Sequence, residues 1–333
     1  MTKIAIYGVG AVGGLIAARL ALAGHPVSAI ARGRTLSALQ QKGLRIDGAS
    51  GIETVHIRAE EEPASLGVQD FVIITVKGPA LPEIAAKIAP LIGPHTTVVT
   101  AMNGIPWWFF EADAHTVQAM KPKSLDPHGG LSTAIPFQHI LGCVVLFASY
   151  CPEPGLVKLK FGNKLILGEA AGGSSERQRS LIALLNDAGI DAEASLDIRT
   201  DIWRKLCGNM IMNPVSTLTG ATAEQILNDP LVRAFCLAAT QEAANLGARL
   251  GFPLKPGTDA QGALTLVSGP FKTSMLQDAE AGRPLEIDSL VTAVHEIAQS
   301  IQFPTPAIDS LLGLVRLYAH TRGIYGNFRK SAD

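Results

Sequence analysis

The sequence predicts an α/β protein with a second domain that is entirely helical. Strand-like and helical runs alternate from the N-terminus to about residue 195, which is the pattern of a parallel sheet covered by helices. After Ile198 the strand signals nearly vanish and long helical patterns take over. With 333 residues, of which 47% are hydrophobic and 17% are charged, the chain is long enough for two domains with sizeable cores.

A glycine-rich turn lies close to the N-terminus. The motif G-x-G-x-x-G at residues 8–13 stands between a strand-like run, residues 4–7, and a helix of small residues, and a second strand-like run, residues 27–30, follows. This is the spacing of a βαβ unit that binds a dinucleotide. The first glycine permits the tight turn, the second lets a pyrophosphate approach the backbone, and the third allows close packing of helix on strand. We therefore predict a Rossmann-type dinucleotide-binding domain over residues 1–196, with an ordinary glycine turn as the alternative. The predicted cofactor-binding residues of the turn are Gly8, Gly10, Ala11, Val12 and Gly13.

The residues after the second strand-like run indicate which dinucleotide is bound. NAD sites usually carry Asp or Glu there to bind the ribose 2′-hydroxyl. This chain has no acid at that point and has Arg32 and Arg34, whose guanidinium groups suit a 2′-phosphate. NADP(H) is therefore the predicted cofactor, and simple solvation of the two arginines is the alternative.

The later elements continue the pattern. A helical stretch around residues 81–91 separates strand-like runs at 71–76 and 96–101. The sheet is expected to extend through strands at 143–150, 156–160, 164–167 and 191–194, with a helix around 176–186. The second domain, residues 197–333, is expected to hold helices at 198–212, 230–250, 258–280 and 288–301 and another after Pro306.

Two polar residues follow strands of the predicted sheet. Lys77 comes after the run at 71–76, and Asn103 comes after the run at 96–101. Because the carboxyl ends of parallel strands bind ligands in open α/β sheets, both are candidates to contact nicotinamide and substrate. An ordinary Asn-Gly turn and a solvated lysine are the alternatives.

The first helix of the second domain carries a polar stripe. Lys205, Asn209 and Asn213 are spaced four residues apart and line up on one face. A solvated face, the alternative, would more often carry Glu, Lys, Arg and Gln, which form helices better than asparagine does. A lysine ammonium flanked by amides suits carbonyl reduction, because it can polarise a ketone oxygen and supply its proton.

Further polar residues stand near the end of the helical domain. Ser274 with Gln277 fits a capping box, and Asp288 fits an N-cap for the next helix, so structural roles explain these residues at least as well as binding does. Glu286 has no such simple structural explanation.

These motifs together closely resemble the ketopantoate reductases, the 2-dehydropantoate 2-reductase family. The resemblance covers almost the whole chain in the same order, and its most specific parts are Trp203-Arg-Lys205-Leu-x-x-Asn209-x-x-x-Asn213-Pro214, Ser274-Met-Leu-Gln-Asp278 and Leu285-Glu286-Ile-Asp288. It implies that Lys205 is the general acid/base of a catalytic group with Glu286 and Asn103. It further implies that Asn209, Asn213, Ser274 and Lys77 bind substrate, that Lys77 and Asn103 also lie beside the nicotinamide, and that Arg32 binds the 2′-phosphate.

One segment departs from the family pattern. After Asn103-Gly104 the chain continues with the aromatic run Trp107-Trp108-Phe109-Phe110 and a polar stretch to residue 130, where typical family members are shorter. The run could form a pocket wall, a lid, a subunit contact or part of the core. We predict that Trp107 or Trp108 shapes the substrate side of the site.

Composition excludes several other functions. A net charge of −1 provides no long-range attraction to nucleic acid or anionic lipid, and no apolar stretch is long enough for a membrane helix. The histidines lack metal-ligand spacing, so no metal is predicted. The four cysteines are expected to be buried thiols of a cytoplasmic protein: Cys143, Cys151, Cys207 and Cys236.

The predicted function is NADPH-dependent reduction of a 2-oxo acid to a 2-hydroxy acid, with ketopantoate to D-pantoate as the leading reaction. A bulkier branched or aromatic 2-oxo acid is the alternative substrate, and a catalytically silent NADP(H) sensor is the alternative class. The joint presence of Lys205, Glu286 and Asn103 favours the enzyme, since a sensor would need only the region around residues 8–34. The partner is a small-molecule acid, and a homodimer is left open.

Overall fold

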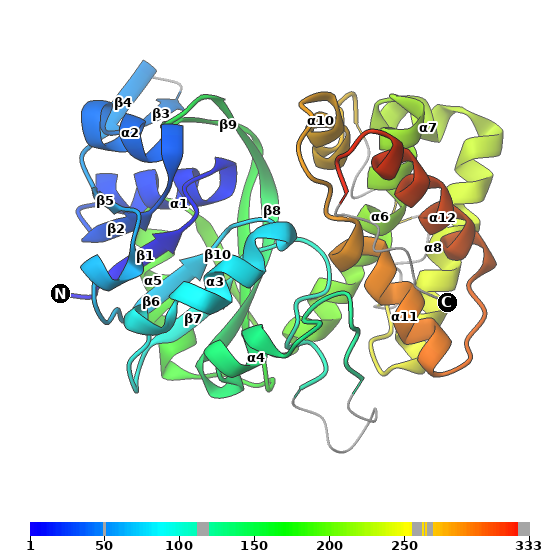
Figure 1. Cartoon of the computed structure of the whole chain (residues 1–333), viewed down its shortest axis with the longest axis horizontal. Coiled ribbons are helices and arrows are strands. Elements are labelled where there is room, and N and C mark those ends of the chain that lie inside the picture. Colours follow the sequence, from blue (N-terminus) through cyan, green and yellow to red (C-terminus); the bar gives the residue numbers. More distant parts are fainter. Residues whose placement is uncertain (49–50, 112–119, 255–261, 263, 265–268, 326–333) are drawn as a thin grey trace. The chain divides into compact units, whose positions relative to one another are not determined.

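The computed structural model describes residues 1–48, 51–111, 120–254, 262, 264 and 269–325 (Figure 1). The chain divides into two compact units. The first comprises residues 1–102 and 129–201, and the second comprises residues 103–128 and 202–333. The predicted domain boundary after residue 196 stays a prediction, because a division by packing does not measure independent folding.

The first unit is built on one sheet. Within the described residues it has ten strands, and six of them follow the order β5-β2-β1-β6-β7-β8, all parallel to their neighbours. This is the 3-2-1-4-5-6 order of a dinucleotide-binding sheet. The strands are β1 (Ile4–Tyr7), β2 (Val27–Ile30), β3 (Leu44–Gly48), β4 (Gly51–Val55), β5 (Arg58–Glu60), β6 (Phe71–Ile74), β7 (Thr97–Thr100), β8 (Ile140–Glu153), β9 (Leu156–Glu169) and β10 (Asp191–Ser195).

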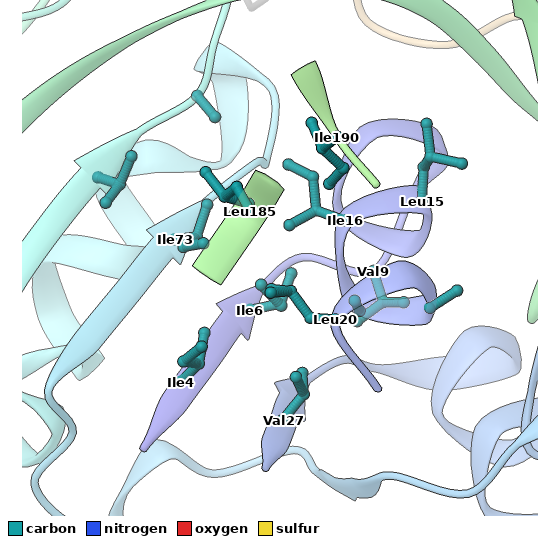
Figure 2. Close-up of a cluster of buried hydrophobic side chains, with 14 of the residues drawn as sticks. Ile4, Ile6, Val9, Leu15, Ile16, Leu20, Val27, Ile73, Leu185 and Ile190 are labelled. Atoms are coloured by element: carbon teal, nitrogen blue, oxygen red, sulfur yellow. The ribbon is translucent and has the colours of Figure 1, made fainter. Parts of the chain in front are cut away.

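The core of this unit lies between the sheet and its covering helices. Figure 2 shows Ile4 and Ile6 of β1 together with Leu15 and Ile16 of α1 in one buried cluster. Small side chains elsewhere on α1 let it lie close to the sheet, as the alanine- and glycine-rich sequence indicates. The helices of the unit are α1 (Ala11–Leu22), α2 (Gly33–Lys42), α3 (Leu81–Lys87), α4 (Gly130–Ala134) and α5 (Glu176–Asp187), with short 3₁₀ turns η1 (Pro63–Ser65), η2 (Gly78–Ala80), η3 (Ala89–Leu91) and η4 (Phe137–His139).

The far side of the sheet is mixed. β8 and β9 form a long antiparallel pair, and β10 joins β9 in parallel, so the segments after residue 140 extend the sheet as predicted. The hairpin β3–β4 was not predicted; it adds to the sheet through β3, which runs parallel to β9.

The second unit is helical within the described residues. The helix α6 (Ile198–Thr219) begins in the first unit and continues into the second. The others are α7 (Ala223–Asn228), α8 (Pro230–Arg249), α10 (Ser274–Glu280), the π-helical turn η5 (Asp288–Thr292), α11 (Ala293–Ser300) and α12 (Pro306–Thr321). Most of the first part of the predicted helix 258–280 lies outside the described residues. No helix in the described part of the chain is both long and apolar enough to cross a bilayer.

The second unit also contains an excursion of the chain that was not predicted. After β7 the chain leaves the first unit, and the described residues 103–111 and 120–128 belong to the second unit before the chain returns to the first at α4. This excursion carries both Asn103 and the aromatic run.

Candidate active site

The glycine turn lies where the strand order of the sheet reverses. β1 pairs with β6, and the sheet grows from β1 toward β2 on one side and from β6 toward β7 on the other. Gly8 directly follows β1 with a φ of +98°, and a Cβ there would lie 2.5 Å from Cγ1 of Val76, which follows β6. Conformation and space both require glycine, and ligands bind at this reversal in open α/β sheets.

Gly13 is required by the packing of α1. A Cβ at this position would lie 2.2 Å from the Gly8 carbonyl oxygen and 2.3 Å from Oγ1 of Thr75. Thr75 itself donates a hydrogen bond to that carbonyl at 2.5 Å, so its hydroxyl holds the turn in place. Thr75 was not predicted, because a threonine at the end of a strand carries no distinctive signal in the sequence.

Gly10 differs from both, since a Cβ there would meet no atom within 4 Å. It precedes α1, which has neither a side-chain cap nor an acidic residue in its first turn. The N–H groups of such a helix end attract anions. The open space and the uncapped amides fit the pyrophosphate of a dinucleotide, which Gly10, Ala11 and Val12 would hold.

Arg32 is the N-cap residue of α2 and is paired with an acid. Its Nη1 donates to Oε2 of Glu83 on α3, and the Arg32 side chain remains 65% exposed. A 2′-phosphate bound by Arg32 would therefore compete with the Glu83 carboxylate. Sequence reasoning missed Glu83, because it stands 51 residues away from Arg32. Arg34 is exposed, and so is Lys77, which follows β6 and directly precedes η2.

In the second unit, two of the predicted catalytic residues contact each other. Lys205 Nζ donates to Asn103 Oδ1 at 2.7 Å, and both residues are half-buried. The amide oxygen accepts this hydrogen bond and thereby fixes the direction of the ammonium group.

The rest of the polar stripe continues along α6. Asn209 is half-buried and Asn213 is only 6% exposed, so the solvated-face alternative does not describe the whole stripe. Cys207 lies between them and Lys205, and burial raises the pKa of its thiol to about 12. Cys207 therefore stays protonated at neutral pH and is no nucleophile.

The turn that carries Asn103 is held against the π-helical turn η5. Gly104 has a φ of +81°, and a Cβ there would lie 2.4 Å from the carbonyl oxygen of Ser289. The Ile105 amide donates to this same oxygen at 2.8 Å. π-Helical turns are rare in proteins, and those that occur often lie at functional sites. Sequence reasoning missed Ser289, since a contribution made through the backbone leaves no signal in residue type.

Both predicted caps in this region are wrong. Thr273, not Ser274, caps α10, and its side chain accepts from the Leu276 amide at 3.3 Å. Asp288 does not cap a helix; its carboxylate accepts from the hydroxyl of Tyr325. Burial, and then the Asp288 carboxylate, raise the pKa of Tyr325.

Two further predicted site residues, Ser274 and Glu286, lie in or beside α10 and η5. Ser274 is exposed at the start of α10, and Glu286 is half-buried just before η5. Their roles, like those of Asn209 and Asn213, stay predictions.

The aromatic run is buried in the second unit. Its four members, Trp107, Trp108, Phe109 and Phe110, are at most 6% exposed, as expected of core packing, which was one of the alternatives. The indole Nε1 of Trp107 is buried without a hydrogen-bond partner among the described residues. The predicted role of Trp107 or Trp108 beside the substrate stays a prediction.

Neither the cysteines nor the histidines in the described part of the chain form a candidate metal site. All four cysteines are thiols, but Cys151 is exposed, so the expectation that all are buried is wrong for this one. Cys151 lies on the outer part of β8, beyond the buried stretch of that strand. Within the described residues no group of three or more His, Cys, Asp and Glu side chains could hold a metal ion.

The sheet order, the glycine turn and the helical second unit define a dinucleotide-dependent oxidoreductase of the α/β class. The model of ketopantoate reductase PanE/ApbA matches residues 4–172, and that of its C-terminal part matches residues 197–319. The chain therefore belongs to the ketopantoate reductase family, whose members are NADPH-dependent oxidoreductases. The predicted family, fold class, cofactor and enzyme class are confirmed.

Individual relatives agree with this assignment. The chain is 42% identical over 328 residues to the 2-dehydropantoate 2-reductase of Mesorhizobium japonicum, covering 97% of this chain and 99% of the relative. A candidate ketopantoate reductase from Ralstonia solanacearum MolK2 has a solved structure with 52% identity and a TM-score of 0.91, covering 98% of this chain and all of the other. The 2-dehydropantoate 2-reductase of Methylococcus capsulatus has 26% identity and a TM-score of 0.80, covering 96% and 97% of the two chains.

Proposed function

We propose that the protein reduces a 2-oxo acid to a 2-hydroxy acid with NADPH, and that the reaction is 2-dehydropantoate to D-pantoate. The observation that carries the proposal is the 2.7 Å hydrogen bond between Lys205 and Asn103, because it prepares a proton donor in a chain that also has a dinucleotide turn. The names of the Mesorhizobium japonicum and Methylococcus capsulatus relatives support the choice of substrate.

The chemistry divides between the cofactor and the protein. NADPH, when bound, supplies the hydride. Negative charge then builds on the carbonyl oxygen of the substrate, and the Lys205 ammonium stabilises this charge and gives its proton to the oxygen. Asn103 accepts one N–H of the ammonium, so Lys205 is oriented before the substrate arrives.

Substrate recognition is assigned to the other predicted residues. 2-Dehydropantoate offers a carboxylate, a ketone and a hydroxyl group. The amides of Asn209 and Asn213 can donate to the first and accept from the last, and Ser274 can do the same with its hydroxyl. A carboxylate at Glu286 suits the substrate hydroxyl as an acceptor. Lys77 is assigned to the nicotinamide side together with Asn103.

The test follows NADPH absorbance with a panel of 2-oxo acids. The panel contains 2-dehydropantoate, branched acids of similar size without the hydroxyl, and phenyl-substituted acids. We expect the highest kcat/KM with 2-dehydropantoate, because an acid without the hydroxyl leaves buried polar groups unpaired. A higher value with a phenyl-substituted acid would reassign the substrate, and NADPH binding without turnover of any acid would favour the sensor.

We further propose that the protein acts in the cytoplasm. Burial of Cys143, Cys207 and Cys236 as thiols supports a reducing compartment. A homodimer stays a prediction, which light scattering after size-exclusion chromatography checks through the molar mass relative to 35.0 kDa for one chain.

A further inference from the structure

The excursion contacts the helix of the catalytic lysine at two points. At its start, Asn103 accepts the hydrogen bond from Lys205. Six residues later, Phe109 packs against Trp203 of the same helix, α6. One short segment therefore makes a polar and an aromatic contact with α6, and the proposed function uses only the polar one.

The aromatic contact belongs to a compact cluster of Phe109, Trp203 and Phe252. The ring centroid of Phe109 lies 6.2 Å from that of Trp203 and 5.1 Å from that of Phe252. Trp203 and Phe252 also contact each other at 6.2 Å, and Phe109 and Trp203 are fully buried. Aromatic pairs at these separations stabilise one another beyond the burial of their area.

The indole of Trp203 is fixed on its other side by α8. Its Nε1 donates to the carbonyl oxygen of Ala243 at 3.1 Å. A Cβ at Gly247 would lie 2.1 Å from this nitrogen, so the indole occupies the space that a side chain on α8 would need. Trp203 thus has one position, set by a hydrogen bond, a glycine and the ring of Phe109.

Trp203 and Lys205 point to different sides of α6. They are two residues apart, and residues two apart on an α-helix lie roughly 200° around its axis from each other. A helix anchored by a rigid indole on its buried side cannot rotate, and the lysine on the opposite side keeps its direction. The segment from Asn103 to Phe109 therefore contacts α6 at both of its ends, through Asn103 to Lys205 and through Phe109 to Trp203.

We propose that Phe109 is a positioning residue for Lys205: it holds Trp203, and thereby α6, in the rotation that places the ammonium against Asn103. The proposal rests on the proposed function, in which Lys205 donates the proton. It assigns the aromatic run a role inside the unit that carries the lysine. Loss of the Phe109 ring frees the rotation of α6, and a displacement of about 1 Å at a reacting group can cost as much as 100-fold in rate.

The test compares Phe109→Leu in the parent and in the Lys205→Ala background. In the parent we expect kcat to fall by about 10-fold or more, with an unchanged Kd for NADPH in a fluorescence titration. In the Lys205→Ala background the same substitution is expected to change the residual kcat by less than about two-fold, because no lysine is left to misplace. Phe109→Met, which also removes the ring and has about the same side-chain volume as leucine, is expected to lower kcat by a similar factor.

Phe110→Leu is the matched control. Phe110 is a neighbouring buried ring of the same run, 5% exposed, and it contacts Phe109 at 4.9 Å. Its loss is expected to lower stability and leave kcat within about two-fold of the parent. Hydrogen exchange of the unliganded protein gives a readout besides activity: Phe109→Leu should speed exchange over residues 203–209, and Phe110→Leu should not.

An equal loss of kcat from Phe109→Leu in both backgrounds would overturn the inference, since the ring would then support only the folded state. An unchanged kcat in Lys205→Ala itself would instead overturn the proposed function. If Phe109→Leu does not fold, Phe109→Met carries the same comparison of the two backgrounds.

Discussion

Arg32 and Glu83 form an ion pair at the position predicted for the 2′-phosphate of the cofactor. Arg32 supplies the guanidinium predicted to bind a 2′-phosphate, and Glu83 supplies a carboxylate that already pairs with it. Both side chains are about half exposed or more, at 65% and 47%, so water screens the pair and its contribution to stability is small. Its importance lies in competition with a phosphate for the same guanidinium.

Opposite effects on NADPH affinity are therefore expected from the two residues. Arg32→Ala should weaken NADPH binding roughly 10- to 100-fold, the value of a lost charge-assisted contact. Glu83→Gln should strengthen it about two- to five-fold, because it removes a competing and repelling charge. Fluorescence titration measures both, and NADH, which lacks the 2′-phosphate, is the control ligand. Equal changes for NADH and NADPH would contradict this role.

Residues with local signals could be predicted from the sequence, and residues that act across long separations could not. Gly8 and Gly13 stand in a motif, and Lys205 stands on a helix with a visible polar stripe. Glu83 and Ser289 carry no such signal, because one acts on a residue 51 positions away and the other acts through its carbonyl. The pairing of Lys205 with Asn103 also required the fold, since 102 positions separate them.

At the scale of elements, two glycines of the glycine-rich motif, Gly10 just before α1 and Gly13 in its first turn, face different physical constraints. A Cβ at Gly13 would collide with backbone at 2.2 Å, whereas a Cβ at Gly10 would enter open space. Gly13→Ala should therefore destabilise the first unit by about 1–3 kcal/mol, as overpacking does. Gly10→Ala should fold normally and weaken NADPH binding by at least about 10-fold, because its methyl group occupies space assigned to the pyrophosphate.

Thermal unfolding and NADPH titration of both variants separate these effects. Gly24→Ala is unsuitable as a control because its φ is +85°, whereas Gly313 on α12 has no atom near a Cβ and no positive φ. Gly313→Ala should leave the Kd for NADPH nearly unchanged and raise Tm slightly, because alanine in a helix interior is more stable than glycine by about 0.5–1 kcal/mol. A Gly10→Ala variant that binds NADPH normally would show that the open space is not used by the cofactor.

Strands with a clear hydrophobic signal in the sequence were predicted, and strands without one were missed. β1, β6 and β7 are apolar runs that the sheet buries on both faces, and the sequence indicates them directly. β4 is exposed along most of its length and carries no buried alternation, and in β3 the alternation is limited to Leu44 and Ile46, so the hairpin β3–β4 gives only a weak signal. The excursion of residues 103–128 was missed because its attachment to the second unit is tertiary.

At the scale of the whole molecule, buried thiols should make the free energy of unfolding depend on pH in the alkaline range. Burial raises the pKa of Cys207 to about 12 and that of Cys236 to about 11 in the folded protein. In the unfolded chain a thiol titrates near about 8.5. Above that pH the unfolded state loses protons that the folded state keeps, so the free energy of unfolding should fall as pH rises toward the folded values.

The slope should reach about 1.4 kcal/mol per pH unit for each thiol. Cys207→Ala removes one such contribution and should give a shallower fall of the free energy of unfolding between about pH 9 and 11, measured by urea denaturation. Cys151→Ala, at an exposed position, is the matched control and should keep the slope of the parent. Identical slopes for the parent and Cys207→Ala would contradict the expectation.

The most direct test of the proposed enzyme is the turnover of Lys205→Ala. A proton donor that acts on the developing oxyanion stabilises the transition state more than the bound substrate, so its loss lowers kcat. We expect a fall of about 10²- to 10⁴-fold with 2-dehydropantoate, while the Kd for NADPH stays within about two-fold. Arg204→Ala, one position earlier and about 100° around the helix, is the control and should retain a kcat much closer to that of the parent. A kcat for Lys205→Ala within a few-fold of the parent would contradict the assignment of Lys205 as the general acid.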